Sequence, residues 1–219
     1  VGRSVKDAVR LARVSAAAGA AGLMVHQPPD PFVAPRGIVD YVRRIRDATE
    51  LPIVLYLRND AIGTAAIVDL CSIDGVVGVK WATPNPQRLA EAMRAAPDHL
   101  IWVGGLAEIW APAFYAVGAR GFTSGLINVW PERSVAIFEA LERGDFADAR
   151  RLIDGMRAFE EVRAEEMNGT NVTGVKAALA MIGHDCGHCR PPSAWPLTER
   201  QAHKLRDFLA REGLTPPRS

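Results

Sequence analysis

The sequence predicts an α/β fold in which parallel strands are covered by helices. Five short, nearly continuous apolar runs are separated by stretches with helical spacing of their apolar residues. One run follows the next after about 20 to 35 residues, the length that a strand, a crossover helix and two turns require. Strands that are apolar along their whole length are typical of parallel sheets, in which both faces are buried.

The composition is that of a folded globular protein. The 219 residues are 48% hydrophobic and 23% charged, with a formal net charge of +1. That charge balance argues against a nucleic-acid-binding surface, and no apolar run reaches the roughly 18 residues that span a bilayer. The three cysteines do not form a disulfide scaffold, and no signal peptide is recognisable at the start. We therefore expect a cytoplasmic protein that binds neither nucleic acid nor membrane.

Helix and strand alternate over the first half of the chain. Ser4 is a suitable N-cap for a helix over 5–18, which Gly19 ends. The apolar run 21–26 is expected as the first strand, and the prolines that follow stop it. Further strands are expected at 52–56, 75–80, 100–105 and 121–125, and the helices between them at 37–49, 65–71, 86–95 and 111–117.

From Pro131 onward the pattern becomes helical only. The expected helices cover 131–143, 145–166, 174–181 and 198–212. Strand–helix units therefore come first, and a helical region follows them.

Two architectures fit this order of elements, a doubly wound open sheet and a (β/α)₈ barrel. The open sheet normally carries a glycine-rich phosphate loop after an early strand, and none is present here. A barrel has eight strands and about 250 residues, whereas the apolar runs predict five strands.

Lys80 lies at the end of the predicted strand 75–80, among apolar side chains. A lysine held in such surroundings loses hydration of its ammonium form, so its pKa falls and a free amine becomes available. A free amine attacks ketones and forms a Schiff base. The alternative is a strand-end lysine whose ammonium reaches solvent.

Tyr56 ends the neighbouring strand 52–56 in the same way. Its phenol could donate and accept protons while an imine forms on Lys80. The alternative is a tyrosine at the rim of the core with a satisfied hydroxyl. Each residue supports the functional interpretation of the other, because the active sites of barrels lie where the strands end.

Several motifs in order resemble the dihydrodipicolinate synthase/N-acetylneuraminate lyase family. They are the runs 52–56 and 77–80, Gly104-Gly105, 118–121 with Asn128, and the late segments Val175-Lys176-Ala177-Ala178 and Arg190-Pro191. The family consists of class I Schiff-base enzymes on (β/α)₈ barrels, commonly homo-oligomers such as dimers or homotetramers. The resemblance therefore implies a partial barrel over 1–130, with C-terminal helices packed on it over 131–219.

By this resemblance Lys80 forms the imine and Tyr56 is the catalytic phenol. Thr123 and Gly105 match positions that line the keto-acid pocket. The segment Tyr56-Leu57-Arg58-Asn59-Asp60 is similar to that of 5-dehydro-4-deoxyglucarate dehydratases, and Ser124 with Asn128 agrees with this pattern. Arg58, Ser124 and Asn128 are accordingly expected to bind substrate. The arginine typical of the synthases would fall at Ala61, and a tyrosine that some members pass between subunits would fall near Pro29 or Asp30.

The resemblance also implies that three further strands precede the point where the sequence starts. Val1-Gly2 resembles the tail of the third of them, so the five predicted strands would be barrel strands four to eight. Such a remnant would expose two unpaired sheet edges. We therefore expect the 219-residue chain by itself to be poorly stable and inactive.

Other polar groupings point less clearly to chemistry. Cys186-Gly187-His188-Cys189 has the spacing of a redox or zinc motif, but it lies in a loop and is interpreted as a loop with free thiols. A cluster of four glutamates at 160, 161, 165 and 166 is interpreted as a solvent-facing helix surface. His26 ends a strand, where it either lines the pocket or is a satisfied rim histidine.

The sequence predicts a Schiff-base-forming lyase that acts on a 2-keto acid, with dehydration of a keto-deoxy sugar acid favoured. No metal or organic cofactor is expected, since the iminium on Lys80 is itself the electron sink. The alternatives are a dihydrodipicolinate synthase, a pyruvate aldolase of the same family, and a non-catalytic barrel protein that binds a keto acid or only assembles.

Overall fold

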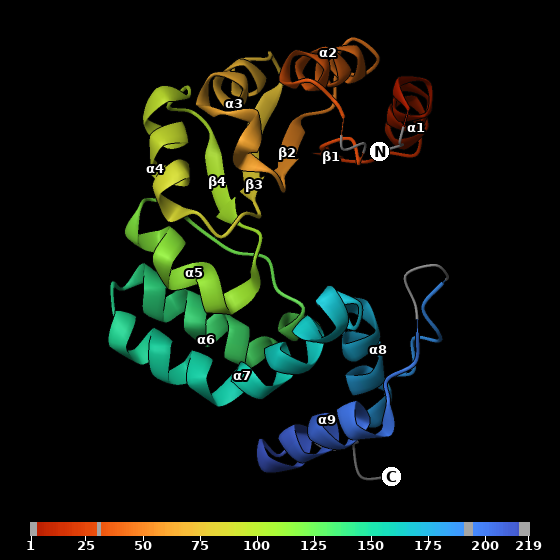
Figure 1. Ribbon diagram of the computed structural model, residues 1–219, viewed down its shortest axis with the longest axis vertical. Coiled ribbons are helices and arrows are strands. Elements are labelled where there is room, and N and C mark those ends of the chain that lie inside the picture. Colours follow the sequence, from red (N-terminus) through yellow and green to blue (C-terminus); the bar gives the residue numbers. More distant parts are fainter. Residues whose placement is uncertain (1–3, 30–31, 191–194, 215–219) are drawn as a thin grey trace. The chain divides into compact units, whose positions relative to one another are not determined.

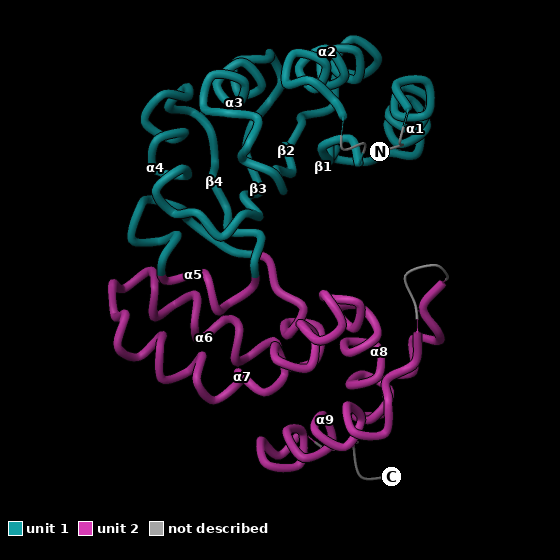
Figure 2. Tube along the Cα trace, in the orientation of Figure 1, with its two compact units in different colours: residues 1–106, 113–122 teal, residues 107–112, 123–219 magenta. Residues whose placement is uncertain are grey.

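The computed structural model describes residues 4–29, 32–190 and 195–214 (Figure 1). The chain forms two compact units, drawn in different colours in Figure 2. Unit 1 comprises Val1–Leu106 and Ala113–Phe122, and unit 2 comprises Ala107–Pro112 and Thr123–Ser219. The expectations for Val1-Gly2, Asp30 and Pro191 fall outside the described residues.

Unit 1 alternates between helix and strand as expected. Its elements are α1 (Val5–Ala17), β1 (Leu23–His26), α2 (Pro35–Arg46), β2 (Ile53–Leu57), the 3₁₀ turn η1 (Asp60–Ile62), α3 (Thr64–Cys71), β3 (Val76–Trp81), α4 (Pro86–Ala95) and β4 (Ile101–Gly104). Local chemistry sets several helix starts: Ser4 caps α1 by accepting from the backbone N–H of Asp7, and prolines open α2 and α4. Helix α5 (Ala107–Ala116) belongs partly to each unit.

The sheet is parallel and its strands lie in chain order, β1-β2-β3-β4. The predicted α/β class with a parallel sheet is therefore confirmed. Helices α2, α3 and α4 follow one another along one side of the strands (Figure 1). The strand side chains buried beneath them include Leu23, Val25, Ile53, Leu55, Leu57, Val76, Val79, Trp81 and Trp102.

The alternate strand residues form a second face that no helix in the described part of unit 1 covers. We call this the open face; it comprises Met24, His26, Val54, Tyr56, Lys80, Ile101 and Val103, all exposed or half-buried. Met24 is 42% exposed and Ile101 63% exposed, although both are large apolar residues. Parallel sheets usually bury both faces, whereas the apolar residues of this face remain partly exposed to solvent.

The fifth expected strand, 121–125, does not form as a strand. Phe122 makes a single parallel bridge to Gly104, and the chain then turns into the 3₁₀ turn η2 (Leu126–Asn128). The turn is stabilised by Ser124, whose Oγ accepts from the backbone N–H of Ile127 at 3.0 Å. A side chain that hydrogen-bonds its own backbone competes with strand pairing, which explains why the apolar run stops short.

Unit 2 is helical, with α6 (Pro131–Glu142), α7 (Phe146–Asn168), α8 (Asn171–Met181) and α9 (Glu199–Arg211). Helix α9 begins with a capping box between Thr198 and Gln201. Among the described residues, no helix is long and apolar enough to cross a membrane. The packing of this region on a barrel stays a prediction.

Helix α7 is interrupted near its end. Glu166, Met167 and Asn168 all have φ between 54° and 65°, a left-handed conformation that costs non-glycine residues about 1–2 kcal/mol each. Glu165 anchors this turn, because its carboxylate accepts from Lys204 at 2.7 Å and from Gln201 at 2.9 Å. The expectation that all four glutamates of the cluster face solvent is therefore wrong for Glu165.

Candidate active site

Three chemically active side chains lie side by side at the carboxyl ends of three strands. The register pairs His26 with Tyr56, and Tyr56 with Lys80. Each of these residues is at or next to the last position of its strand, and all three point to the open face. The predicted neighbourhood of Tyr56 and Lys80 therefore follows directly from strand register.

The Tyr56 ring is the centre of this row. The Nζ atom of Lys80 lies 4.2 Å from the ring centroid, and the guanidinium carbon of Arg58 lies 6.0 Å from it. The His26 ring meets the same ring at 4.4 Å between centroids, with an interplanar angle of 74°. This edge-to-face arrangement is a favourable one for aromatic rings.

The environment of Lys80 favours its neutral amine. Partial burial lowers the pKa of Lys80, and the positive charge of Arg58 lowers it further. Burial also lowers the pKa of His26, and positive charges, those of Lys80 and Arg58 among them, add to that effect. At neutral pH the row therefore offers an imidazole in its neutral form and a lysine that loses its proton more readily than an ordinary one.

Gly105 follows β4 and lies against Lys80. Its backbone N–H donates to the carbonyl oxygen of Trp81 at 2.6 Å. A Cβ atom at this position would approach the Cβ of Ala82 to 2.7 Å and the Cε of Lys80 to 3.1 Å. Only glycine lets the chain pass this close, so Gly105 shapes the space beside the amine.

Two sets of side-chain hydrogen bonds fix the loops at this edge of the sheet, and the sequence does not predict them. The side chain of Gln27 accepts from the backbone N–H of Arg58 at 2.6 Å and of Asn59 at 2.8 Å, and it donates to the Asn59 carbonyl at 2.9 Å. Asn85 donates to Asp60 at 2.7 Å, which ties the loop after β3 to the loop after β2. These contacts join residues 25 or more positions apart, so no local pattern announces them.

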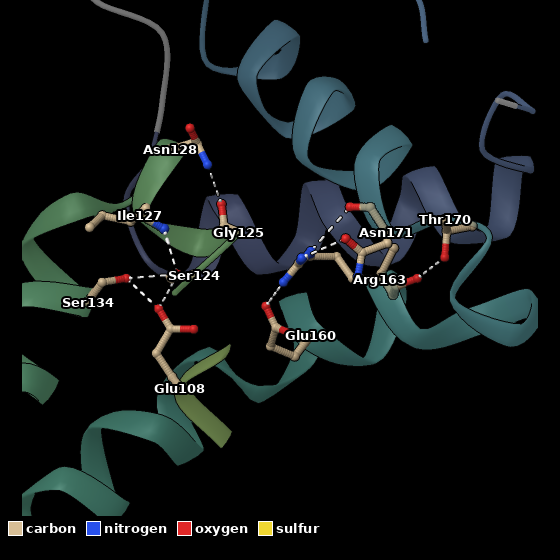
Figure 3. A network of polar contacts seen from close by, with 11 residues as sticks. Glu108, Ser124, Gly125, Ile127, Asn128, Ser134, Glu160, Arg163, Thr170 and Asn171 are labelled. Atoms are coloured by element: carbon tan, nitrogen blue, oxygen red, sulfur yellow. Dashed lines mark hydrogen bonds and ion pairs between the residues drawn. The ribbon is translucent and has the colours of Figure 1, made fainter. Parts of the chain in front are cut away.

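The remaining predicted substrate-binding residues, Thr123, Ser124 and Asn128, belong to unit 2. Ser124 donates a hydrogen bond to Oε1 of Glu108, and Ser134 donates to the same oxygen at 2.5 Å (Figure 3). Asn128 is exposed, and its amide donates to the Gly125 carbonyl at 3.1 Å. Thr123 is half-buried next to Ser124. The hydroxyl proton of Ser124 is thus used in the hydrogen bond to Glu108, an acidic residue that the sequence does not predict to lie in a site.

A buried ion pair lies in the same network. Arg163 is 7% exposed, pairs with Glu160, and donates to the side-chain oxygen of Asn171 at 2.9 Å (Figure 3). Burial raises the pKa of Glu160; Arg163 opposes this, and the charge of Glu108 adds to it. The expectation that Glu160 faces solvent is therefore wrong, because helix packing around Arg163 encloses it.

The cysteine motif lies in the loop after α8. Cys186 is exposed and Cys189 half-buried, and neither is in a disulfide. Lys176 donates to the carbonyl oxygens of Cys186 and His188 at 3.1 and 3.2 Å, which ties the loop to α8. Among the described residues, no three His, Cys, Asp or Glu side chains converge as a metal site would require.

Comparisons with known proteins show which family and fold the chain shares. The chain is 34% identical over 212 residues to a probable 5-dehydro-4-deoxyglucarate dehydratase of Streptomyces avermitilis, covering 93% of this chain and 67% of the relative. It is 35% identical to a similarly named protein of Streptomyces coelicolor, covering 88% of this chain and 63% of that one. The chain thus spans about two thirds of the length of these curated relatives.

The crystal structure of dihydrodipicolinate synthase from Oceanobacillus iheyensis matches with a TM-score of 0.91 and 36% identity. The match covers 96% of this chain and 70% of the synthase. A sequence model of the dihydrodipicolinate synthetase family matches residues 1–212. The chain belongs to the dihydrodipicolinate synthetase family.

Proposed function

We propose that the whole protein is a Schiff-base-forming lyase acting on a 2-keto acid, with dehydration of a keto-deoxy sugar acid as its reaction. The observation that carries this proposal is the row at the strand ends, where Lys80 Nζ lies 4.2 Å from the ring centroid of Tyr56. An amine with a lowered pKa beside a phenol is the pair that imine chemistry requires.

In this proposal the neutral amine of Lys80 attacks the ketone carbon of the substrate. Tyr56 donates the proton that lets the hydroxyl of the carbinolamine leave as water, and an iminium forms. The iminium withdraws electrons from the neighbouring carbon, which loses a proton and gives an enamine. The hydroxyl on the next carbon then takes a proton and leaves as water, and hydrolysis of the imine releases the product and restores the amine of Lys80. No separate cofactor is needed for these steps.

The substrate-binding roles rest on motif positions. Gly105 leaves room beside the amine, and Arg58 supplies a positive charge near a carboxylate-bearing substrate. Thr123, Ser124 and Asn128 are assigned to the keto-acid pocket on the resemblance of their segment.

A dehydratase is favoured over a synthase. The two Streptomyces relatives carry the dehydratase name, and Arg58-Asn59 follows Tyr56 as in that group. The second candidate is dihydrodipicolinate synthesis, which the likeness to the Oceanobacillus synthase supports. Ala61 stands where the synthases have a substrate-binding arginine, which weighs against it.

We further propose that the four strands and the bridging Phe122 correspond to barrel strands four to eight. Two features support this: the open face exposes Ile101 and Met24, and among the described residues β1 pairs on one side only, with β2. The relatives have a further segment beyond the two thirds that match this chain. Strands supplied by such a segment would cover the open face and pair with the edge of β1.

Borohydride reduction in the presence of pyruvate tests the proposed chemistry, because it converts an imine into a stable secondary amine. The test uses the 219-residue chain and a form joined to the preceding segment of a relative. We expect the joined form, at least, to gain the mass of one reduced pyruvate, and its Lys80→Met variant to gain none. Lys176→Met, which removes a lysine outside the row, is the matched control and should still be labelled. An unlabelled, folded joined form would reject the lyase.

A further inference from the structure

His26 occupies a place that the proposed roles leave unused. It ends β1 at the register position of Tyr56, points to the open face, and is exposed where Tyr56 is half-buried. Its ring lies 4.4 Å from the Tyr56 ring, on the strand opposite the one that carries Lys80. The imidazole therefore lies against the Tyr56 ring and is open to solvent.

The backbone holds His26 firmly in this place. The next residue, Gln27, donates its backbone N–H to the Tyr56 carbonyl at 3.3 Å, and its side chain binds the backbone of Arg58 and Asn59. Strand β1 is thereby fastened to β2 at the residue after the histidine. The His26–Tyr56 contact is thus set by a rigid strand pair, which is what a precise proton transfer needs.

The charges around His26 are positive. The described groups that act on it are Tyr56 on β2, Arg58 just after β2 and Lys80 on β3. A second proton on the imidazole is disfavoured in such surroundings, so the ring is neutral near neutral pH and keeps a lone pair to which a proton can be transferred.

We propose that His26 exchanges protons with Tyr56 during the reaction at Lys80, an inference that rests on the proposed function. When the iminium forms, the carbon next to it must lose a proton. Tyr56, which gave its proton to the carbinolamine hydroxyl, first regains one from solvent. Its oxygen then takes the proton from the substrate carbon while its O–H proton passes to the imidazole, directly or through one water. Tyr56 is unchanged by this transfer, and the imidazolium of His26 releases its proton to solvent.

The pH dependence of this route has a definite sign. The imidazole must be neutral to accept a proton, and its surroundings lower its pKa below the ordinary value of 6.5. Proton removal from the substrate therefore persists somewhat below that pH and fails as the pH falls through the pKa of His26. A variant without the imidazole loses this dependence and keeps only the one that protonation of Lys80 imposes on imine formation.

Two measurements on the form that gives a Lys80 adduct test the inference. Borohydride trapping reports imine formation, and deuterium uptake at C3 of pyruvate in D₂O, followed by proton NMR, reports proton removal. His26→Gln removes the acceptor, and His26→Phe keeps a ring against Tyr56 while also removing it. His203→Gln, which removes an exposed imidazole on α9 away from the row, is the matched control.

We expect both His26 variants to keep the adduct on Lys80 and to lose at least about tenfold in the rate of deuterium uptake near neutral pH. In both, the rate of uptake per imine formed should no longer fall as the pH drops through the pKa of His26, and His203→Gln should match the wild type. Deuterium uptake at the wild-type rate in His26→Gln would overturn the inference. Uptake restored in His26→Phe would also overturn it, since a packing role would then suffice. Loss of the adduct from folded His26→Gln would do the same, whereas an unlabelled wild type would reject the proposed function itself.

Discussion

Lys80 depends on its neighbours for its chemistry more than on its own position. Burial is the larger cause of its lowered pKa, and the charge of Arg58 is the second. The two causes can be separated, since Arg58 can be changed without filling or emptying the space around the amine.

Arg58→Gln should therefore raise the pKa of Lys80. Imine formation with pyruvate, measured by borohydride trapping at a series of pH values, should have its midpoint at higher pH than in the wild type. Arg36→Gln, an exposed arginine at the start of α2, removes the same charge away from the row and should leave the midpoint unchanged. A midpoint that stays in place in Arg58→Gln would show that burial alone sets the pKa.

Gly105 is important because a side chain at its position would clash with its neighbours. Gly105→Ala would place a Cβ at 2.7 Å from Ala82 and 2.9 Å from the Trp81 carbonyl oxygen, closer than packed atoms allow. We expect a loss of about 1–3 kcal/mol in the free energy of unfolding, measured with urea, together with weaker trapping at Lys80. Gly37→Ala is the control, because a Cβ there meets only Val33 at 3.6 Å within helix α2. It should stabilise the protein by up to about 1 kcal/mol, and equal effects of the two changes would contradict the packing account.

At the scale of elements, the break in α7 is where backbone strain concentrates. Met167 has a φ of 58° and is 97% exposed, so its side chain contributes no packing to offset the strain. The strain persists because Thr170 and the partners of Glu165 hold the turn; Thr170 donates to the Val162 carbonyl at 2.6 Å.

Met167→Gly should accordingly stabilise the protein by about 0.5–1 kcal/mol in urea unfolding, since glycine adopts this conformation without a penalty. Val172→Gly is the comparison: Val172 is also exposed but lies in α8, and its change should destabilise by about 0.5 kcal/mol. Destabilisation by Met167→Gly would mean that the left-handed turn carries no strain.

The sequence predicted the elements that local patterns determine. Continuous apolar runs placed β2 and β3 within a residue of their observed ends, and those ends put Tyr56 beside Lys80. The failures have a different cause. The run 121–125 forms only a bridge because Ser124 bonds to the backbone of Ile127. The side chain of Glu160 is only 12% exposed because it pairs with Arg163, three residues further along α7. Contacts such as Gln27 with Asn59 depend on strand register, which no single segment encodes.

At the scale of the whole molecule, the open face is the feature that a complete barrel would remove. Joining the chain to the segment that would supply the preceding strands should bury Met24 and Ile101. Because the denaturant dependence of unfolding scales with the surface exposed, the joined form should show a larger m-value and a higher midpoint in urea. It should also bind less of an apolar dye. A joined form with the same m-value and the same dye binding would contradict the proposal that these are barrel strands four to eight.

The most direct test of the account is the identity of the lysine that forms the imine. The chain offers four lysines, Lys6, Lys80, Lys176 and Lys204. After borohydride reduction with pyruvate, peptide mapping by mass spectrometry should place the reduced adduct on Lys80 alone. Its yield should rise with pH through the lowered pKa of that amine. An adduct distributed over the exposed lysines, or absent from Lys80, would contradict the claim that the row at the strand ends is a Schiff-base site.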